Sequence, residues 1–191
     1  LYKIQKNEFI LFLAAAGGVG LVASQWAKSI GCKMIGTVST KEKGELAKEH
    51  GCEYIINYKE ENVSKKVMEI TNNEGVQVVY DGVGRDTFLE SINSLSVRGL
   101  LVSFGQSSGM VDKLDLHQIF NPKSLFYTRP NLMNYTLNNE ELKECSNKLF
   151  EKMRIGEIKS NIFKKIKLEE AQKAHEILQS RKSFGSIILE P

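Results

Sequence analysis

An apolar run that stops at a cluster of glycines is the feature that most constrains this chain. Residues Phe9–Ala16 are apolar, and Gly17, Gly18 and Gly20 follow them directly. Apolar residues then recur at helical spacing as far as Gly31, where the run ends. The pattern predicts a buried strand that turns tightly into a helix. The start of such a helix offers free backbone N–H groups and a partial positive charge, which together bind anions.

This turn matches the loop that holds the diphosphate of a dinucleotide in doubly wound α/β proteins. Read as G-x-G-x-x-G, the stretch Ala15–Gly20 has alanine at the first position, which still permits a close turn. Gly17 lets the backbone approach the phosphates, and Gly20 lets the helix lie against the strand. A glycine-rich corner without a ligand is the alternative reading. The predicted cofactor contacts of this loop are Ala16, Gly17, Gly18, Val19 and Gly20.

Strands and helices alternate along the first 130 residues, which predicts βαβ units and a parallel sheet with helices on both faces. We expect a doubly wound, six-stranded Rossmann sheet of strand order 3-2-1-4-5-6, with the ligand over the carboxyl ends of strands 1 and 4. The five strands expected after the first are Cys32–Val38, Tyr54–Tyr58, Val76–Tyr80, Leu100–Phe104 and Ser124–Thr128.

The alternation breaks at Pro130, and residues 131–191 form a smaller α+β segment in this interpretation. The predicted domains are therefore 1–130 for dinucleotide binding and 131–191 for the rest. The elements expected in the second part are a helix from Asn138 or Asn139 to about Arg154, a strand at Ile162–Ile166, a helix at about Glu169–Ser180 and a strand at Ser186–Leu189.

The second strand indicates which dinucleotide is preferred. An NAD site needs a carboxylate at the end of this strand, and none occurs from Phe9 to Lys41. The hydroxyls of Thr37 and Ser39 and the ammonium of Lys43 suit a 2′-phosphate instead. We therefore predict NADPH as the cofactor. The alternative is that the lysines of this helix are solvated surface residues.

Three further strand ends carry candidate cofactor contacts. Tyr58 ends the third strand and either flanks the adenosine or is a rim tyrosine. Asp81 ends the fourth strand and is read as a turn or capping residue rather than a catalytic acid. Glycine at position 82 lets a ribose approach. The loop after the fifth strand exposes N–H and hydroxyl groups where a nicotinamide is expected, through Phe104, Gly105, Gln106 and Ser107.

Composition and residue spacing exclude several function classes. The chain is 41% hydrophobic and 26% charged, and its net charge of +3 is too small and too evenly spread to favour nucleic acid. No segment predicts a membrane span or a secretory leader. The 3 cysteines are far apart and form no CxxC, so neither a metal site nor a disulfide framework is predicted, and a cytoplasmic location fits best.

No catalytic residue is predicted. His50, His117 and His175 stand in no activating motif with a cysteine or serine, and we interpret them as surface or packing residues.

Taken together, these motifs resemble the quinone oxidoreductase branch of the medium-chain dehydrogenase/reductase superfamily. The resemblance implies NADPH binding without zinc, through the glycine loop, Lys43, Tyr58, the Phe-Gly-x-Ser loop and Arg181. It covers nearly the whole chain. The segments that carry it are Ala14–Gly20 with Gln25–Lys28, Gly36–Val38, Ile56–Tyr58, Val79–Asp86, Ser103–Ser108, Thr128–Pro130 and Ala171–Leu178.

The chain departs from this family in two respects. The family carries an N-terminal GroES-like barrel domain, which forms the other wall of the cofactor cleft and which is missing from this sequence. The resemblance implies that residues 131–191 would complete that barrel, so the sequence, which starts at Leu1, looks like a piece of a longer protein. The second departure is Gly82, where we expect a serine in close relatives.

The sequence therefore predicts the NADPH-binding portion of a zinc-independent quinone oxidoreductase, in which reducing equivalents pass from NADPH to a quinone. Two alternatives stay open, an enoyl or alkenal reductase on the same scaffold and a non-catalytic nucleotide- or RNA-binding module. We also expect a homodimer, because the sixth strand, Ser124–Thr128, can pair with its own copy across a two-fold axis.

Overall fold

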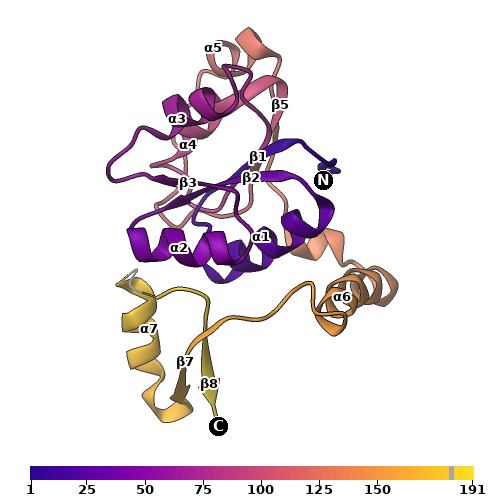
Figure 1. The fold of residues 1–191 in the computed structure, drawn as a ribbon, viewed down its shortest axis with the longest axis vertical. Coiled ribbons are helices and arrows are strands. Elements are labelled where there is room, and N and C mark those ends of the chain that lie inside the picture. Colours follow the sequence, from indigo (N-terminus) through magenta and orange to yellow (C-terminus); the bar gives the residue numbers. More distant parts are fainter. Residues whose placement is uncertain (181–182) are drawn as a thin grey trace.

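A parallel sheet of six strands forms the larger part of the molecule, and its order β3-β2-β1-β4-β5-β6 confirms the predicted topology (Figure 1). The structure is a computed structural model that describes residues 1–180 and 183–191. All neighbouring strands of this sheet run parallel. The strands are β1 (Phe9–Phe12), β2 (Lys33–Val38), β3 (Tyr54–Asn57), β4 (Val76–Asp81), β5 (Leu95–Ser103) and β6 (Phe126–Thr128).

Helices cover both faces of this sheet, as a doubly wound fold requires. Helices α1 (Gly18–Ile30) and α2 (Lys41–Glu49) pack on one face, and α3 (Val63–Ile70) and α4 (Phe88–Ser94) on the other. The short helix α5 (Leu116–Phe120) and the 3-10 turn η1 (Asn121–Lys123) lead into β6.

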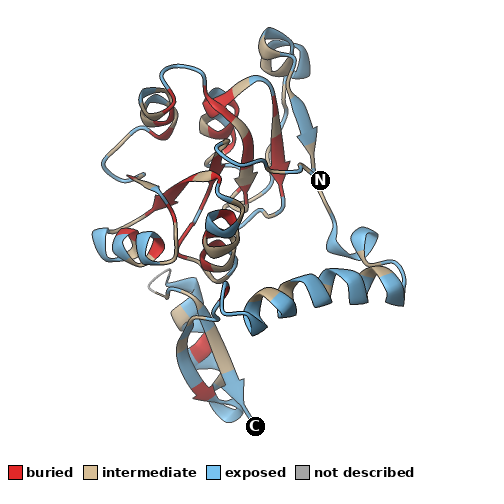
Figure 2. Ribbon diagram, turned by 45° about the vertical axis from the view of Figure 1, so that its right-hand side comes forward, coloured by how far each residue is buried: buried red, intermediate tan, exposed pale blue. Residues whose placement is uncertain are grey.

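Successive side chains of the central strand feed two separate cores, because a strand points its side chains alternately to opposite faces. Ile10 and Phe12 pack into the core beneath α1 and α2, whereas Leu11 and Leu13 pack into the core beneath α3 and α4. All four are buried, and the buried residues concentrate on the sheet in Figure 2. Because helices cover both faces of the sheet, β1 needs apolar side chains on both sides, and its sequence is therefore almost continuously apolar.

The ends of the helices follow local signals in the sequence. Gly31 adopts φ 82° and ends α1 with a left-handed cap. The hydroxyl of Thr40 accepts a hydrogen bond from the Lys43 N–H at 3.3 Å and so caps α2. The Gly31 cap directs the chain into the amino end of β2, and the Thr40 cap starts α2 at the carboxyl edge of the sheet.

Two predicted boundaries are wrong for backbone reasons. The sixth strand begins at Phe126, because Ser124 has φ 52° and lies in the left-handed region. The fifth strand, expected to begin at Leu100, begins at Leu95, directly after α4 ends at Ser94. Arg98 has φ 61°, and the pairing of β4 with β5 changes register in this irregular stretch.

The second part of the chain is smaller and more exposed (Figures 1 and 2). Strands β7 and β8 form a separate parallel pair. Among the described residues of this part, the buried hydrophobic ones are Ile158, Ile166 and Ala174. Its elements are η2 (Leu132–Tyr135), α6 (Asn139–Arg154), β7 (Ile162–Lys167), η3 (Leu168–Glu170), α7 (Ala171–Gln179) and β8 (Ser186–Glu190).

Helix α1 carries the contacts that attach this second part to the sheet domain. The side-chain amide of Gln25 donates to the Lys159 carbonyl at 2.9 Å and accepts from the Lys159 N–H at 2.7 Å. The Lys152 ammonium lies 5.9 Å from the centre of the Trp26 ring and donates to the Ser29 hydroxyl at 3.1 Å. The end of α6 and the segment that leads into β7 are therefore held against the helix that follows the glycine loop.

The longest described helix is α6, with 16 residues, and its sequence is rich in charged side chains. Within the described chain, no helix combines the length and the apolar character that crossing a membrane requires.

The buried thiols provide a test of the packing. Burial raises the pKa of Cys32 to about 11 and that of Cys52 to about 12, whereas Cys145 is exposed. Because the thiolate is the reactive form, we expect a thiol-specific disulfide reagent at pH 8 to modify Cys145 rapidly and the other two only after unfolding. Absorbance of the released thiol would show one equivalent in buffer and three in denaturant. Immediate release of three equivalents from the native chain would contradict the packing.

Candidate functional site: the carboxyl edge of the sheet

The turn from β1 into α1 brings backbone so close together that its glycine is required. A Cβ at Gly20 would lie 2.5 Å from the Ala15 carbonyl oxygen and 2.6 Å from that of Ala14. Ala14 itself has φ 58°, and its carbonyl accepts from the Gly17 N–H at 2.9 Å. The helix can therefore start against the strand only where residue 20 has no side chain, as the glycine pattern predicts.

The first turn of α1 presents unused donors at this edge. Among the described residues, the N–H groups of Gly18, Val19 and Gly20 make no hydrogen bond, and the first turn holds no acidic residue. The side chain of Val19 is 65% exposed, so it does not cover these groups. Free N–H groups beside a close backbone turn fit a diphosphate in charge and in shape.

Strand β2 supports the glycine loop from behind. The Thr37 hydroxyl accepts from the Ala14 N–H at 3.2 Å, and the Thr37 carbonyl accepts from the Ala15 N–H at 3.0 Å. Thr37 is buried, so its role in this structure is to orient the loop. A Cβ at Gly36 would lie 2.6 Å from both the Ala15 Cβ and the Cys52 Sγ. The glycine loop can pack this closely on β2 only because residue 36 has no side chain.

A basic corner lies where β2 and β3 end. The Tyr58 N–H donates to the Val38 carbonyl at 3.1 Å, which places Tyr58 beside the start of the Ser39–Thr40 turn. Tyr58 is 45% exposed. Burial and the neighbouring ammonium of Lys59 lower the pKa of Lys43 below that of an ordinary lysine. Two cations that disfavour each other's charge favour an anion between them.

The carboxylate of Asp81 anchors the turn after β4. One oxygen accepts from the N–H groups of Val83 at 2.7 Å and Gly84 at 2.9 Å. The other accepts from the hydroxyls of Thr87 at 2.9 Å and Ser91 at 2.8 Å. Asp81 is buried and has its oxygens occupied by these donors, which supports the reading as a turn residue rather than an acid that exchanges protons.

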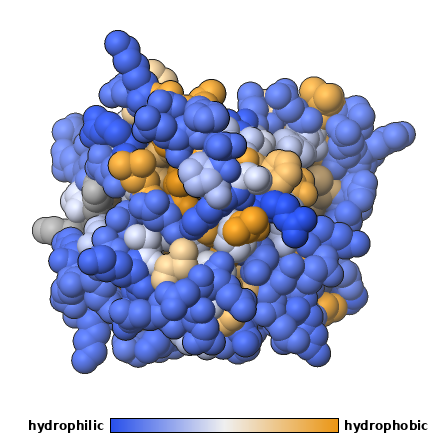
Figure 3. Space-filling view, turned by 90° about the horizontal axis from the view of Figure 1, so that it is seen from above, coloured by the Kyte–Doolittle hydropathy of each residue, from blue (hydrophilic) through white to orange (hydrophobic). Residues whose placement is uncertain are grey.

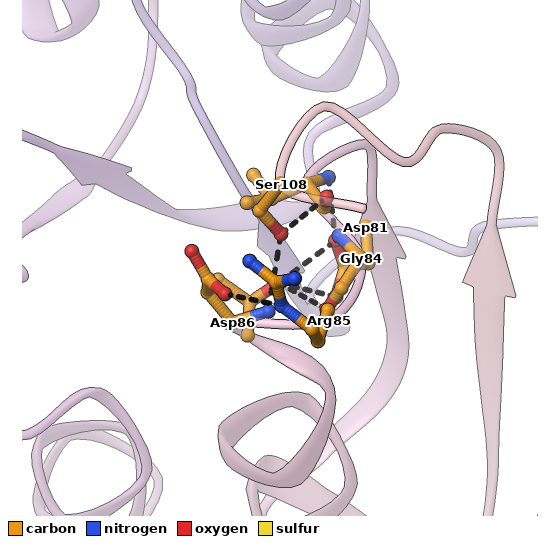
Figure 4. Close-up of polar contacts among 7 residues, drawn as sticks. Asp81, Gly84, Arg85, Asp86 and Ser108 are labelled. Carbon is orange, nitrogen blue, oxygen red and sulfur yellow. Dashed lines mark hydrogen bonds and ion pairs between the residues drawn. The ribbon is translucent and has the colours of Figure 1, made fainter. Parts of the chain in front are cut away.

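The loops after β4 and β5 are fastened to each other (Figure 4). The hydroxyl of Ser108 donates to the Val83 carbonyl at 2.8 Å and accepts from the Asp86 N–H at 3.1 Å. The Phe104 N–H donates to the Asp81 carbonyl at 2.9 Å, and the Arg85 N–H donates to the Gly109 carbonyl at 3.2 Å. The two loops therefore form one surface at the edge of the sheet.

Phe104 belongs to that surface. Its ring centroid is 5.7 Å from that of Phe12 at the end of β1, and the side chain is 38% exposed. A Cβ at Gly82 would lie 2.9 Å from two atoms of the Phe104 ring. Position 82, where a serine was expected, is a glycine, and the Phe104 ring packs directly on its backbone.

An apolar pocket adjoins this loop on the side of α5. It has a volume of about 530 Å³, and the side chains of Gln106 and Arg129, which hydrogen-bond to each other at 2.5 Å, line it together with Met110, Phe120 and Tyr127. Figure 3 views the molecule from the α5 end and shows apolar side chains in separate patches among hydrophilic ones.

The structure brings most of the predicted contacts to one edge of the sheet. The glycine loop, Ser39, Lys43, Tyr58 and the 104–107 loop all follow the carboxyl ends of parallel strands. Arg181 lies outside the described residues. Sequence reasoning missed Gly36, Lys59 and the approach of β8 to the glycine loop. A glycine within an otherwise apolar strand was the available signal for the first of these.

The described residues do not offer a metal site. Within residues 1–180 and 183–191, no three side chains of the His, Cys, Asp and Glu types come together in a way that would hold a metal ion. His50 is engaged in packing, since its Nδ1 lies 2.8 Å from the Leu46 carbonyl oxygen and its Nε2 3.4 Å from the Asn161 amide nitrogen.

A comparison with known proteins identifies the family. Residues 18–152 match the family model described as zinc-binding dehydrogenase. The chain is 48% identical to quinone oxidoreductase 1 of Escherichia coli and 39% identical to 2-haloacrylate reductase of a Burkholderia species, with 100% of this chain covered in both cases. It covers 59% of the first relative and 57% of the second, so it spans less than two thirds of their length.

Solved structures of such proteins superimpose closely on this chain. A structure of Escherichia coli quinone oxidoreductase complexed with NADPH matches with a TM-score of 0.96 at 50% identity, over 100% of this chain and 59% of that one. Pseudomonas syringae quinone oxidoreductase matches with a TM-score of 0.96 at 44% identity, over 100% of this chain and 58% of that one. The chain therefore belongs to the zinc-binding dehydrogenase family, in the quinone oxidoreductase branch of the medium-chain dehydrogenases/reductases.

Proposed function

We propose that this chain is the NADPH-binding portion of a zinc-independent quinone oxidoreductase. The observation that carries the proposal is the first turn of α1, where three backbone N–H groups stand unused beside a turn that admits no side chain at Gly20. The NADPH complex of a relative that is 50% identical supports the same cofactor.

We infer that the cofactor lies along the carboxyl edge of the sheet. Its diphosphate would bind the first turn of α1, its 2′-phosphate the corner of Ser39, Lys43 and Tyr58, and its nicotinamide the loop after β5. Thr37 would act chiefly by holding the glycine loop. The full proposed set is Ala16, Gly17, Gly18, Val19, Gly20, Thr37, Ser39, Lys43, Tyr58, Gly82, Phe104, Gly105, Gln106, Ser107 and Arg181, the last of which lies outside the described residues.

The chain contributes orientation rather than acid–base chemistry to the proposed reaction. NADPH supplies the reducing equivalents when it is bound. The loops after β4 and β5, fastened through Ser108 and Asp81, hold one face of the nicotinamide site in a fixed position. The aromatic ring of Phe104 would cover that face. We assign no residue of this chain as catalytic.

The substrate class follows from the relatives and is a quinone in this proposal. An enone or a related activated alkene is the second candidate, because 2-haloacrylate reductase of a Burkholderia species is 39% identical over the whole chain. A panel of quinones and activated alkenes, assayed with the longer protein, distinguishes the two. Nothing in the comparisons favours the nucleic acid-binding alternative.

We also propose the division into a dinucleotide-binding domain at 1–130 and a segment at 131–191 that belongs to the substrate domain. The relatives are longer than this chain, and residues 131–191 leave apolar side chains such as Leu142 and Phe150 exposed. We infer that the second wall of the cleft comes from sequence that these 191 residues do not include. A cytoplasmic location and a homodimer complete the proposal.

Replacing Lys43 tests the choice between NADPH and NADH. We expect Lys43→Met to weaken NADPH binding about tenfold, because a charge-assisted hydrogen bond to the 2′-phosphate is lost, and to leave NADH binding unchanged. Methionine keeps the apolar stem of the side chain. Calorimetric titration with both dinucleotides measures the two affinities.

The matched control is Lys48→Met, which removes an exposed lysine near the other end of α2. It should leave both affinities as they are. Equal weakening of NADPH and NADH by Lys43→Met would place Lys43 away from the 2′-phosphate and would contradict the proposed specificity.

The incomplete cleft predicts binding without turnover. We expect these 191 residues to bind NADPH while oxidising it no faster in the presence of 1,4-benzoquinone than in control reactions without protein. Loss of NADPH absorbance measures the rate. Rapid quinone-dependent oxidation by this chain alone would show that it holds a complete site.

The open edge of β6 predicts the dimer. Phe126 is 60% exposed on a strand that pairs only with β5 among the described strands. Pairing across a two-fold axis would bring the two copies of this residue together, so Phe126→Lys should shift a dimer to monomers by charge repulsion. Light scattering coupled to size exclusion measures the mass. Phe150→Lys, an equally exposed site on α6, is the control, and a wild-type mass that stays monomeric at all concentrations would refute the dimer.

A further inference from the structure

The end of β6 reaches the loop after β5 through a single side chain. Strand β6 pairs in parallel with β5, with Thr128 beside Val102, so the next residue, Arg129, lies at the same edge of the sheet as that loop. Because Pro130 follows, helical backbone is disfavoured at Arg129, and the chain continues in the direction of the strand. The segment Thr128–Pro130 carries part of the family resemblance, yet the proposed cofactor site gives it no role.

The guanidinium of Arg129 is bound to the side chain of Gln106. Its Nη2 donates to the Gln106 Oε1 at 2.5 Å. The apolar pocket flanks this pair, and among the described residues that line the pocket none carries a carboxylate that would compete for the guanidinium. The glutamine oxygen is therefore the acceptor that fixes where Arg129 points.

The backbone of Gln106 is fixed independently of Arg129. A Cβ at Gly84 would lie 3.1 Å from the Gln106 Cα, so the loop packs on the turn after β4. The Gln106 carbonyl accepts from the Gly109 N–H at 2.9 Å, and the Ser107 N–H donates to the Gly82 carbonyl at 3.4 Å. What these backbone contacts leave open is the direction of the glutamine side chain and of its amide.

The chemistry of the two side chains decides that direction. A glutamine amide carries an acceptor oxygen and a donor nitrogen, whereas a guanidinium has donors only. Arg129 therefore binds the oxygen and turns the NH₂ group away from itself. Within the described part of the chain, the Gln106 Nε2 donates to no other group. The pair thus presents N–H donors on a loop whose position is already set.

We propose that Arg129 is a positioning residue for the nicotinamide end of the cofactor, which it serves by holding the Gln106 amide with its N–H groups toward the bound dinucleotide. The inference rests on the proposed function, which lays the nicotinamide against the loop after β5. The acceptor in this proposal is the oxygen of the nicotinamide carboxamide. Without Arg129 the amide is free to turn over and present its own oxygen, which repels that acceptor.

The test compares two ligands that differ only in the nicotinamide. We expect Arg129→Met to bind NADPH about fivefold more weakly, because the orientation of one hydrogen-bond donor is lost, and to bind 2′-phospho-ADP-ribose as before. Arg129→Lys keeps a donor to the glutamine oxygen and should retain most of the NADPH affinity. Calorimetric titration of the 191-residue chain measures both ligands.

Gln106→Glu separates the orientation of the amide from a simple tether between the two loops. Glutamate has the same shape and binds Arg129 more strongly through its charge, but it has no N–H group to offer. We expect it to weaken NADPH binding about fivefold and to leave 2′-phospho-ADP-ribose binding unchanged. Wild-type NADPH affinity in this variant would mean that Arg129 acts only by tethering the loop, and it would overturn the assignment.

Arg154→Met is the matched control, because Arg154 is an exposed arginine at the end of α6 whose guanidinium bonds to Glu151. It should leave both affinities unchanged. Equal weakening of both ligands by Arg129→Met, together with a lower unfolding temperature, would show a structural role and overturn the proposal, as would an unchanged NADPH affinity. If the wild-type chain binds neither ligand, the proposed function itself fails, which is a distinct result.

Discussion

The contact between the first turn of α1 and the carbonyl groups of Ala14 and Ala15 is the constraint on which the rest of the structure depends. Because Gly20 lets the helix start directly against this backbone, the N–H groups of α1 face the edge of the sheet instead of a neighbouring side chain. Thr37 holds the same loop from the next strand with two hydrogen bonds. The position of the proposed diphosphate site therefore depends on packing within the sheet rather than on any charged side chain.

Much of this fold could be predicted because its signals are local. The glycine that ends α1, the cap at Thr40 and the apolar strands depend on residues near one another in sequence, and the strand order follows from the right-handed βαβ rule. The predicted starts of the fifth and sixth strands, at Leu100 and Ser124, were wrong because they depend on an irregular β5 and on left-handed backbone at Ser124, which hydrophobic periodicity does not report.

The site could be predicted only where a sequence motif indicates it. The glycine loop and the missing carboxylate of the second strand can be read directly, whereas the hydrogen bond from Arg129 to Gln106 joins residues that only the tertiary fold brings together. The same holds for Lys59, whose effect on the pKa of Lys43 depends on the pairing of β2 with β3. Tertiary contacts of this kind produce no periodic pattern in the sequence, so an interpretation based on local patterns cannot find them.

The absence of a side chain at Gly36 has a consequence for how this protein can vary. Positions 15, 36 and 52 share one small volume, since a Cβ at Gly36 would meet both the Ala15 methyl group and the Cys52 sulfur at 2.6 Å. Their substitutions are therefore coupled: an alanine at 36 is tolerable only when the contacts with both residue 15 and residue 52 are relieved. A larger residue at one of these three positions therefore requires smaller residues at the other two, so we expect the three positions to vary together.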